Sequence, residues 1–256
     1  MIRTAAQADL PSIRELLVRA NDTPYDIGKV AEEKCFGDGF EGSPRVRVFG
    51  DFEGVAVTCG KHLRILAVDR RRRGRGIGTA LVRDSNALVV AAEPGNYFTP
   101  GVSEDVARFF EKCGYAETAR TQNLIGESGG QAILPVQVSD REKVLAFIEK
   151  NFGAIWRFEA AKGTTIFSVE DGGEIAGFST HNANNHGLGW FGPTGVARSQ
   201  RGRGLGRALL LASLADLQRL GYHRVVIPWT DAIEFYRKTC GAQIESRFVI
   251  LRKRGA

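Results

Sequence analysis

A short string of arginines and glycines occurs twice in the 256-residue chain. It reads Arg-Gly-Arg-Gly-Ile-Gly at residues 73–78 and Arg-Gly-Arg-Gly-Leu-Gly at residues 201–206, 128 positions later. Glycines let a main chain approach a ligand closely and adopt positive φ. The first amides of a helix lack intrahelical partners and attract anions. Such a string between a strand and a helix predicts an anion site, and its natural ligand is a pyrophosphate.

The residues around both strings indicate the elements that would position them. A strand-like run ends at Val68 before the first string, and another ends at Val196 before the second. An Ala-Leu pair follows each string at the same distance, within an apolar pattern typical of a helix. Each string is therefore expected to connect a strand to a helix.

The repeat divides the chain into two domains of ordinary size, each long enough for one core. We expect a first domain at 1–125, a glycine-rich linker at 126–132 and a second domain at 133–256. Each half reads as strand, helix, three strands, helix, strand, helix and strand, with room for one more helix after the first. This order predicts an α/β (α+β) fold in which helices flank both faces of a mostly antiparallel, mixed sheet.

Charge and composition narrow the possible ligands and locations. The net charge is +6, and much of the excess lies at 70–75 and 198–207, on the repeated string. Aromatic interleaving and zinc-ligand spacing do not accompany it, so we expect a small polyphosphate and no nucleic acid and no metal. The chain has no apolar run of about 18 residues and opens without a signal-like segment, which favours a cytoplasmic protein that does not enter a membrane.

A second glycine string, Gly-Asp-Gly-Phe-Glu-Gly at residues 37–42, has the GxGxxG spacing of dinucleotide sites. In those sites the string follows a strand and opens a helix, whereas here it precedes a strand. We therefore do not interpret residues 37–42 as a nucleotide site.

The Arg/Gln-x-x-Gly-x-Gly string between strand and helix resembles motif A of the GCN5-related N-acetyltransferases (GNATs). Arg73, Gly76 and Gly78 meet it in the first half, and Arg201, Gly204 and Gly206 in the second. Residues 233–238, Ile-Glu-Phe-Tyr-Arg-Lys, also resemble the Phe-Tyr helix of that family, with residues 107–112 as the counterpart. The whole chain resembles a tandem, two-domain bacterial member.

The resemblance implies a site for acetyl-CoA between two strands that splay apart, at the levels of Val196 and Trp229. The main chain near Val196 would polarise the thioester carbonyl, and Tyr236 would protonate the departing thiolate. The pyrophosphate of coenzyme A would be held by main-chain amides of Arg201, Gly202, Arg203, Gly204, Leu205 and Gly206. The corresponding candidates in the first half are Arg73, Gly74, Gly76 and Gly78.

The two halves differ at the proposed proton donor. The position that matches Tyr236 is Phe110, which has no proton to give. We therefore expect the second half to be catalytic and the first to be non-catalytic, whether it binds a cofactor, shapes the substrate pocket or supports the fold.

The general base is less evident than the acid. The candidates are Asp231, Glu234, His181 and His186, and deprotonation through water is a further route. Asp231 stands between the last strand before the Tyr236 helix and that helix, where it would face the cofactor or serve as a helix N-cap.

These inferences predict an acetyl-CoA-dependent N-acetyltransferase acting on the primary amine of a small molecule. Residues 191–196, with Trp229 and residues 233–236, look like the C-terminal halves of bacterial tandem members, some of which acetylate glucosamine and related amino sugars. Amino sugars are thus candidate acceptors, beside aminoglycosides, polyamines, amino acids and peptide N-termini. The alternative is a non-catalytic acyl-CoA-binding or regulatory protein. The sequence leaves the oligomeric state open.

Overall fold

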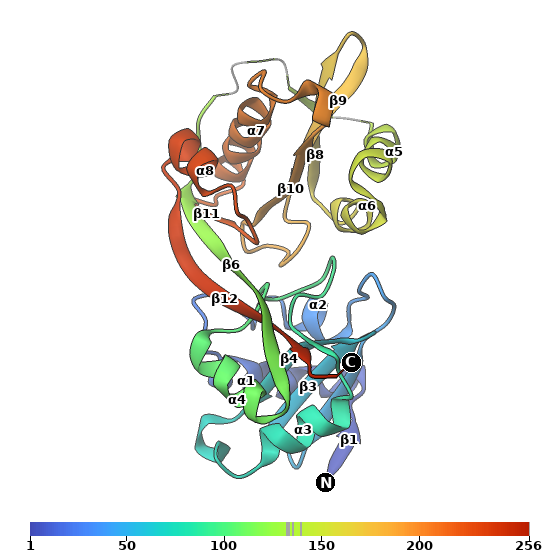
Figure 1. The fold of residues 1–256 in the computed structure, drawn as a ribbon, viewed down its shortest axis with the longest axis vertical. Helices are drawn as coiled ribbons and strands as arrows, with labels where there is room; N and C mark the ends of the chain where they lie inside the picture. Colours follow the sequence, from blue (N-terminus) through green and yellow to red (C-terminus); the bar gives the residue numbers. More distant parts are fainter. Residues whose placement is uncertain (132–133, 135, 139, 256) are drawn as a thin grey trace. The chain divides into compact units, whose positions relative to one another are not determined.

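The computed structural model describes residues 1–131, 134, 136–138 and 140–255, which form two compact units (Figure 1). Unit 1 comprises Met1–Thr121 and Arg247–Ala256, and unit 2 comprises Gln122–Ser246. The chain passes from unit 1 to unit 2 within strand β6 (Tyr115–Glu127) and returns within strand β12 (Gln243–Lys253).

This division differs from the expected domains at 1–125 and 133–256. Gly126 and Glu127, assigned to a linker at 126–132, belong to β6 and pair with β11 (Arg224–Ile227). A Cβ on Gly126 would lie 3.4 Å from Ala242, so this glycine allows close packing within a strand. Residue 132 of the expected linker lies outside the described residues.

Unit 1 holds most of an eight-stranded mixed sheet with strand order β1-β2-β3-β4-β5-β12-β6-β11, in which β4 and β5 pair in parallel. Its strands are β1 (Ile2–Thr4), β2 (Arg45–Phe49), β3 (Gly54–Cys59), β4 (His62–Val68) and β5 (Val89–Val90). Its helices are α1 (Leu10–Ala20), α2 (Ala31–Phe36), α3 (Ile77–Ser85) and α4 (Glu104–Lys112).

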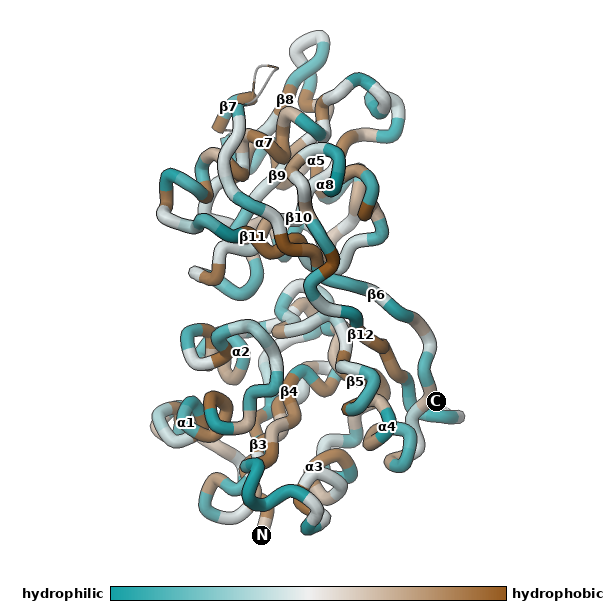
Figure 2. Tube along the Cα trace, turned by 90° about the vertical axis from the view of Figure 1, so that its left-hand side faces the viewer, coloured by the Kyte–Doolittle hydropathy of each residue, from teal (hydrophilic) through white to brown (hydrophobic). Residues whose placement is uncertain are grey.

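The core of unit 1 lies around β3, whose residues are all buried. The apolar side of α3 packs on the sheet through Ile77 and Leu81, together with Phe110 of α4. Helix α1 alternates hydrophilic and hydrophobic residues, buries Ile13, Leu16 and Leu17, and contacts β3 and β4 (Figure 2).

Unit 2 repeats this plan with a separate sheet of order β10-β9-β8-β7, beside the paired strands β6 and β11. The strands are β7 (Gln137–Val138), β8 (Thr165–Asp171), β9 (Glu174–His181) and β10 (Phe191–Val196). The helices are α5 (Arg141–Phe152), α6 (Ala154–Ala160), α7 (Leu205–Arg219) and α8 (Ile233–Cys240). Of the expected strand at 133–138, residues 137–138 form β7, residues 134 and 136 are not in a strand, and residues 133 and 135 lie outside the described residues.

Helix α7 covers one side of β8–β10, and α5 and α6 cover the other (Figure 1). Leu209 of α7 packs on Val169 and Ala176, whereas Leu210 and Leu214 pack on β6 and β11. The prediction of an α/β fold with mixed sheets and flanking helices is confirmed. No helix in the described part of the chain combines the length and apolarity needed to span a membrane.

Candidate functional site

The second arginine-glycine string forms an open loop between β10 and α7. Gly202 and Gly204 have φ of 80° and 80°, a conformation that residues with side chains rarely adopt. A Cβ on either glycine would meet no described atom within 4 Å. Among the described residues, no main-chain carbonyl accepts a hydrogen bond from the amides of residues 202–204. Leu205 and Gly206 begin α7, where amides lack intrahelical acceptors. The loop therefore has room for an anion.

Both arginine side chains of this loop form hydrogen bonds or ion pairs with other residues of unit 2. Arg201 Nε donates to the carbonyl of Val196 at 3.3 Å. Arg203 forms a two-pronged ion pair with Asp171, at 2.7 and 2.9 Å, and also donates to Gln200. The charge expected from Arg203 is thus already paired, and its main-chain amide is the part left for an anion.

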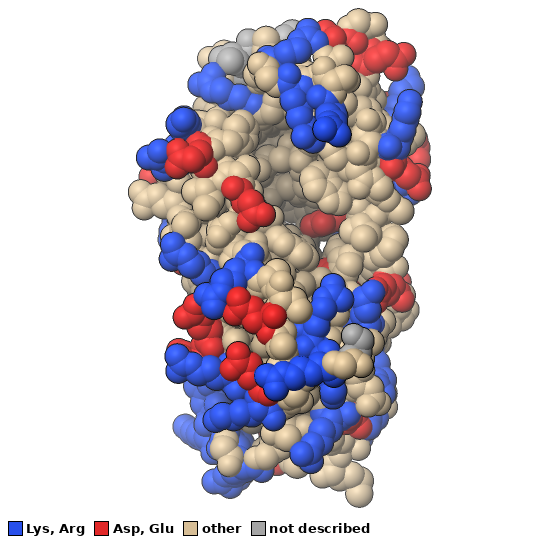
Figure 3. Space-filling model, in the orientation of Figure 1, with Lys and Arg blue, Asp and Glu red and all other residues tan. Residues whose placement is uncertain are grey.

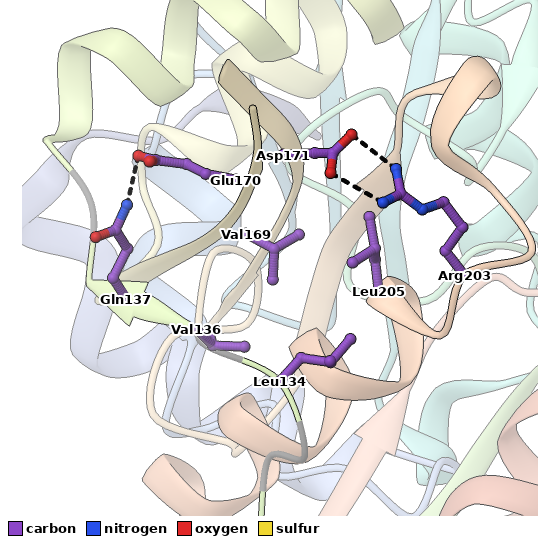
Figure 4. A pocket seen from close by; sticks show the side chains of 8 residues that line it. All are labelled: Leu134, Val136, Gln137, Val169, Glu170, Asp171, Arg203 and Leu205. Atoms are coloured by element: carbon purple, nitrogen blue, oxygen red, sulfur yellow. Dashed lines mark hydrogen bonds and ion pairs between the residues drawn. The ribbon is translucent and has the colours of Figure 1, made fainter. Parts of the chain in front are cut away.

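Arg203 and Leu205 also line a cavity of about 350 Å³ on unit 2 (Figure 4). The Arg203–Asp171 pair lies at one side of this cavity, and a Gln137–Glu170 hydrogen bond lies at another. The remaining lining residues are apolar: Leu134, Val136 and Val169.

The first string forms the same loop in unit 1. Gly74 and Gly76 have φ of 77° and 79°, and a Cβ on either would meet no described atom within 4 Å. Arg73 Nε donates to Val68 at 3.3 Å, which matches the Arg201–Val196 bond. The repeat read from the sequence is therefore a repeat of backbone conformation.

In each unit the loop follows a strand that separates from its parallel neighbour. In unit 2 an isolated bridge between Trp190 and Val226 joins the start of β10 to β11. The sheet containing β10 has no further described pairing with β11. On the face drawn in Figure 3, the surface of unit 2 is hollowed between the part carrying α7, α8 and β11 and the part carrying β8 and β10. Val196 and Trp229, between which the sequence predicts the site, both come after the Trp190–Val226 bridge along the chain, where β10 and β11 have separated.

Tyr236 lies on α8, with only 6% of its surface exposed. Its ring packs against Phe235 at 5.0 Å and 71°, and Phe109 and Phe110 of unit 1 pack together at 5.1 Å and 71°. Burial above all, and the nearby Cys240 thiol, raise the pKa of the Tyr236 phenol to about 12, against the lowering effect of a hydrogen bond with Thr230. The phenol is therefore protonated at neutral pH, as a proton donor must be.

The raised pKa of Tyr236 predicts a measurable loss of stability in alkali. An unfolded tyrosine titrates near pKa 10, so the unfolded chain releases this proton first. The stabilisation is complete below pH 10 and declines as pH rises through 12. Between pH 9 and 11 the wild-type protein should lose about 1 kcal/mol of unfolding free energy more than Tyr236→Phe. Urea unfolding of both proteins measures this, and parallel losses would contradict it.

The candidate bases occupy different surroundings. The exposed Asp231 accepts a hydrogen bond from Gln122 at 3.2 Å, and the N-cap of α8 is Ala232, so the alternative N-cap role of Asp231 is wrong. Glu234 pairs with Arg237 at 2.6 Å, and this hydrogen bond lowers its pKa, which makes it a weaker base.

The two candidate histidines differ in burial. His181 is fully buried on β9, and its Nε2 lies 2.9 Å from Asp216 of α7. Burial lowers the pKa of His181, so it sits in the packing between β9 and α7 as a neutral ring. His186 is exposed, with Nδ1 3.0 Å from the carbonyl of Asn182. Of the four candidates, His181 is buried and Glu234 is paired with Arg237, whereas Asp231 and His186 have exposed side chains.

Two polar residues next to Trp229 in the structure were not expected from the sequence. Asn123 is fully buried on β6, and its side chain accepts from the amide of Trp229 at 3.1 Å, which holds that residue at a φ of 47°. Thr230 bonds both Tyr236 and the amide of Ala232. Asn123 lies in a strand of polar and apolar residues 106 positions before Trp229, so no local pattern marks it.

Comparison with protein families gives one match for each half. The family described as Acetyltransferase (GNAT) family matches residues 134–242, and Acetyltransferase (GNAT) domain matches residues 50–126. No curated protein matches the sequence.

Solved structures of similar fold cover nearly the whole chain. A GCN5-related N-acetyltransferase from Sphaerobacter thermophilus has a TM-score of 0.67 and 20% identity, over 99% of this chain and 95% of its own. A tandem GNAT protein from the clavulanic acid biosynthesis pathway has a TM-score of 0.67 and 17% identity, over 98% and 97%.

A third structure belongs to a fungal multi-domain β-N-acetylglucosaminidase with a GCN5-related glucosamine N-acetyltransferase region. It has a TM-score of 0.71 and 16% identity over 98% of this chain, which spans only 38% of the fungal protein. At such identities these likenesses show the fold.

Proposed function

Because the chain belongs to the GNAT superfamily, with two domains of that family in tandem, we propose that it is an acyltransferase whose unit 2 transfers an acetyl group from acetyl-CoA to a small primary amine. The observation that carries this proposal is the open loop of residues 201–206, which ends at the start of a 15-residue helix. The alternative, a non-catalytic acyl-CoA-binding or regulatory protein, would bind acetyl-CoA without acetylating an amine.

The residues of unit 2 fit coenzyme A. The main chain at Gly202 and Gly204 faces open space, so a diphosphate can approach the amides of residues 201–206. The bound thioester supplies an activated acetyl group. The part of this chain is to hold the diphosphate, to offer the main chain near Val196 to the carbonyl oxygen, and to hold a proton on Tyr236.

Tyr236 acts by position, because burial makes it a weaker acid than an ordinary tyrosine. A free thiol has a pKa near 8.5, so a phenol of higher pKa assists a departing thiolate only when it is held in place. The Thr230 hydrogen bond and the packing against Phe235 and Phe191 hold the ring. For the base, Asp231 is the candidate next to this helix.

An amino sugar is the first acceptor to test. This choice rests on the string at residues 191–196 and on the glucosamine N-acetyltransferase region named for the fungal structure. The test measures coenzyme A release from acetyl-CoA with glucosamine, an aminoglycoside, a polyamine and amino acids. Acetylation of one of these amines supports the enzyme. Binding of acetyl-CoA with no turnover of any amine would favour the non-catalytic alternative.

Gly204→Glu should weaken acetyl-CoA binding at least about 100-fold, because a carboxylate beside a diphosphate repels it by a few kcal/mol. The position is exposed and no described atom blocks a Cβ, so the fold should survive. Gly204→Ala is the matched control, since it brings the same backbone strain at positive φ without the charge. Calorimetry measures both, and equal affinities in wild type and Gly204→Glu would exclude this loop as the site.

A further inference from the structure

In unit 1, the gap between the separating strands is bridged by a buried ion pair. Strands β4 and β5 pair only at His62–Val89 and Leu63–Val90. Directly beyond this pairing, Arg64 reaches Glu93, which follows β5 by three residues. Both side chains have no exposed surface.

Four hydrogen bonds within unit 1 hold the guanidinium of Arg64. Its Nη2 donates to Glu93 Oε1 at 2.7 Å, and its Nε donates to the other carboxylate oxygen. Its Nη1 donates to the carbonyls of Lys34 at 3.0 Å and Gly37 at 2.8 Å. The ion pair and its hydrogen bonds therefore connect β4, α2 and the segment after β5.

The glycine string at residues 37–42, which is not a nucleotide site, closes over this ion pair. A Cβ on Gly39 would collide with the Glu93 carboxylate and lie 3.0 Å from Arg64 Nη2. Asn96 fastens the string, because its Nδ2 donates to the carbonyls of Gly37 at 3.1 Å and Asp38 at 3.0 Å. The glycine at position 39 is thus explained by close approach of the main chain to buried charges.

The matching place in unit 2 carries no such pair. Strands β4 and β10 each bulge against their antiparallel neighbour, and the shift includes Arg64 in β4 and Gly192 in β10, 128 positions apart. A Cβ on Gly192 would meet no described atom within 4 Å. The position three residues beyond the paired strand, Glu93 in unit 1, is Thr230 in unit 2. Unit 2 therefore has a glycine and a neutral side chain where unit 1 has two charges.

We propose that the Arg64–Glu93 ion pair, covered by residues 37–42, fills the space between β4 and the segment after β5 in unit 1. Acyl-CoA is therefore excluded from unit 1, and the chain binds one acyl-CoA, in unit 2. The proposal rests on the proposed function of unit 2. On this proposal the loop of residues 73–78 is open, but the space that an acyl group would need next to it is filled by the ion pair.

Two measurements on the full-length wild-type chain test the proposal. Calorimetry with acetyl-CoA should give one molecule bound per chain, and hydrogen exchange should show ligand-induced protection at residues 201–207 and none at 73–79. Two molecules per chain, or protection at 73–79, would overturn closure of unit 1. No heat and no protection anywhere would instead overturn the proposed function, while the unprotected loop at 73–79 would agree with closure.

A double variant tests the ion pair as the cause of closure. Arg64→Gly with Glu93→Thr gives unit 1 the residues of unit 2 at both positions, and ligand-induced protection should then appear at 73–79. A double variant that keeps the wild-type circular dichroism spectrum and still lacks protection there would overturn the ion pair as the occupant that excludes acyl-CoA. The wild-type measurements decide closure itself if this variant does not fold.

Discussion

Replacing Tyr236 by phenylalanine should lower kcat about 10²- to 10⁴-fold, the usual contribution of one positioned acid. The substitution removes only a hydroxyl from a side chain that is 6% exposed and packed between Phe191 and Phe235. The affinity for acetyl-CoA should change little, because the proposed anion loop lies on another element. Steady-state kinetics with calorimetry separate the two effects.

Phe110→Ala is the matched control in unit 1. Phe110 is 1% exposed, so the cavity should cost about 3–5 kcal/mol of unfolding free energy. The kcat of the folded fraction should remain that of the wild type, because Phe110 has no proton to give. Full kcat in Tyr236→Phe would show that another group protonates the departing thiolate.

Removing one partner of the buried ion pair in unit 1 should strongly destabilise the protein. Glu93→Ala leaves the Arg64 guanidinium buried without its counter-charge, which typically costs about 3–5 kcal/mol. Urea unfolding gives the loss in free energy.

The control is Arg64→Met combined with Glu93→Met, which removes both charges and keeps apolar bulk. It should lose less than Glu93→Ala, because no uncompensated charge remains. A double variant at least as unstable as Glu93→Ala would show that packing and not charge pairing decides the stability here.

The sequence was sufficient for features that depend on local pattern. The loops at 73–78 and 201–206 were recognised because alternating glycines before an apolar helical pattern have one common use, and both adopt the same positive φ values. The order of helices and strands followed from periodicity in the same way, and the α/β fold is confirmed.

Features that depend on contacts across the chain were not predicted. Arg64 and Glu93 are 29 residues apart, and only the end of the β4–β5 pairing brings them together. Gly39 appears as part of a nucleotide-like string because sequence shows the glycine but not the charges beneath it. Asn123 and Trp229 meet only because β6 and β11 are neighbours.

The crossing of the chain through β6 and β12 decides how the protein can be dissected. A fragment cut at the midpoint of the sequence would lack Leu251 and Arg252, the partners of Val90 and Val89, and would leave the short strand β5 as an exposed edge. Such an edge invites aggregation, so expression of separate halves should fail for reasons unrelated to catalysis. A circular permutant that joins residue 256 to residue 1 and opens the chain within unit 2 keeps both parts of unit 1 on one continuous segment.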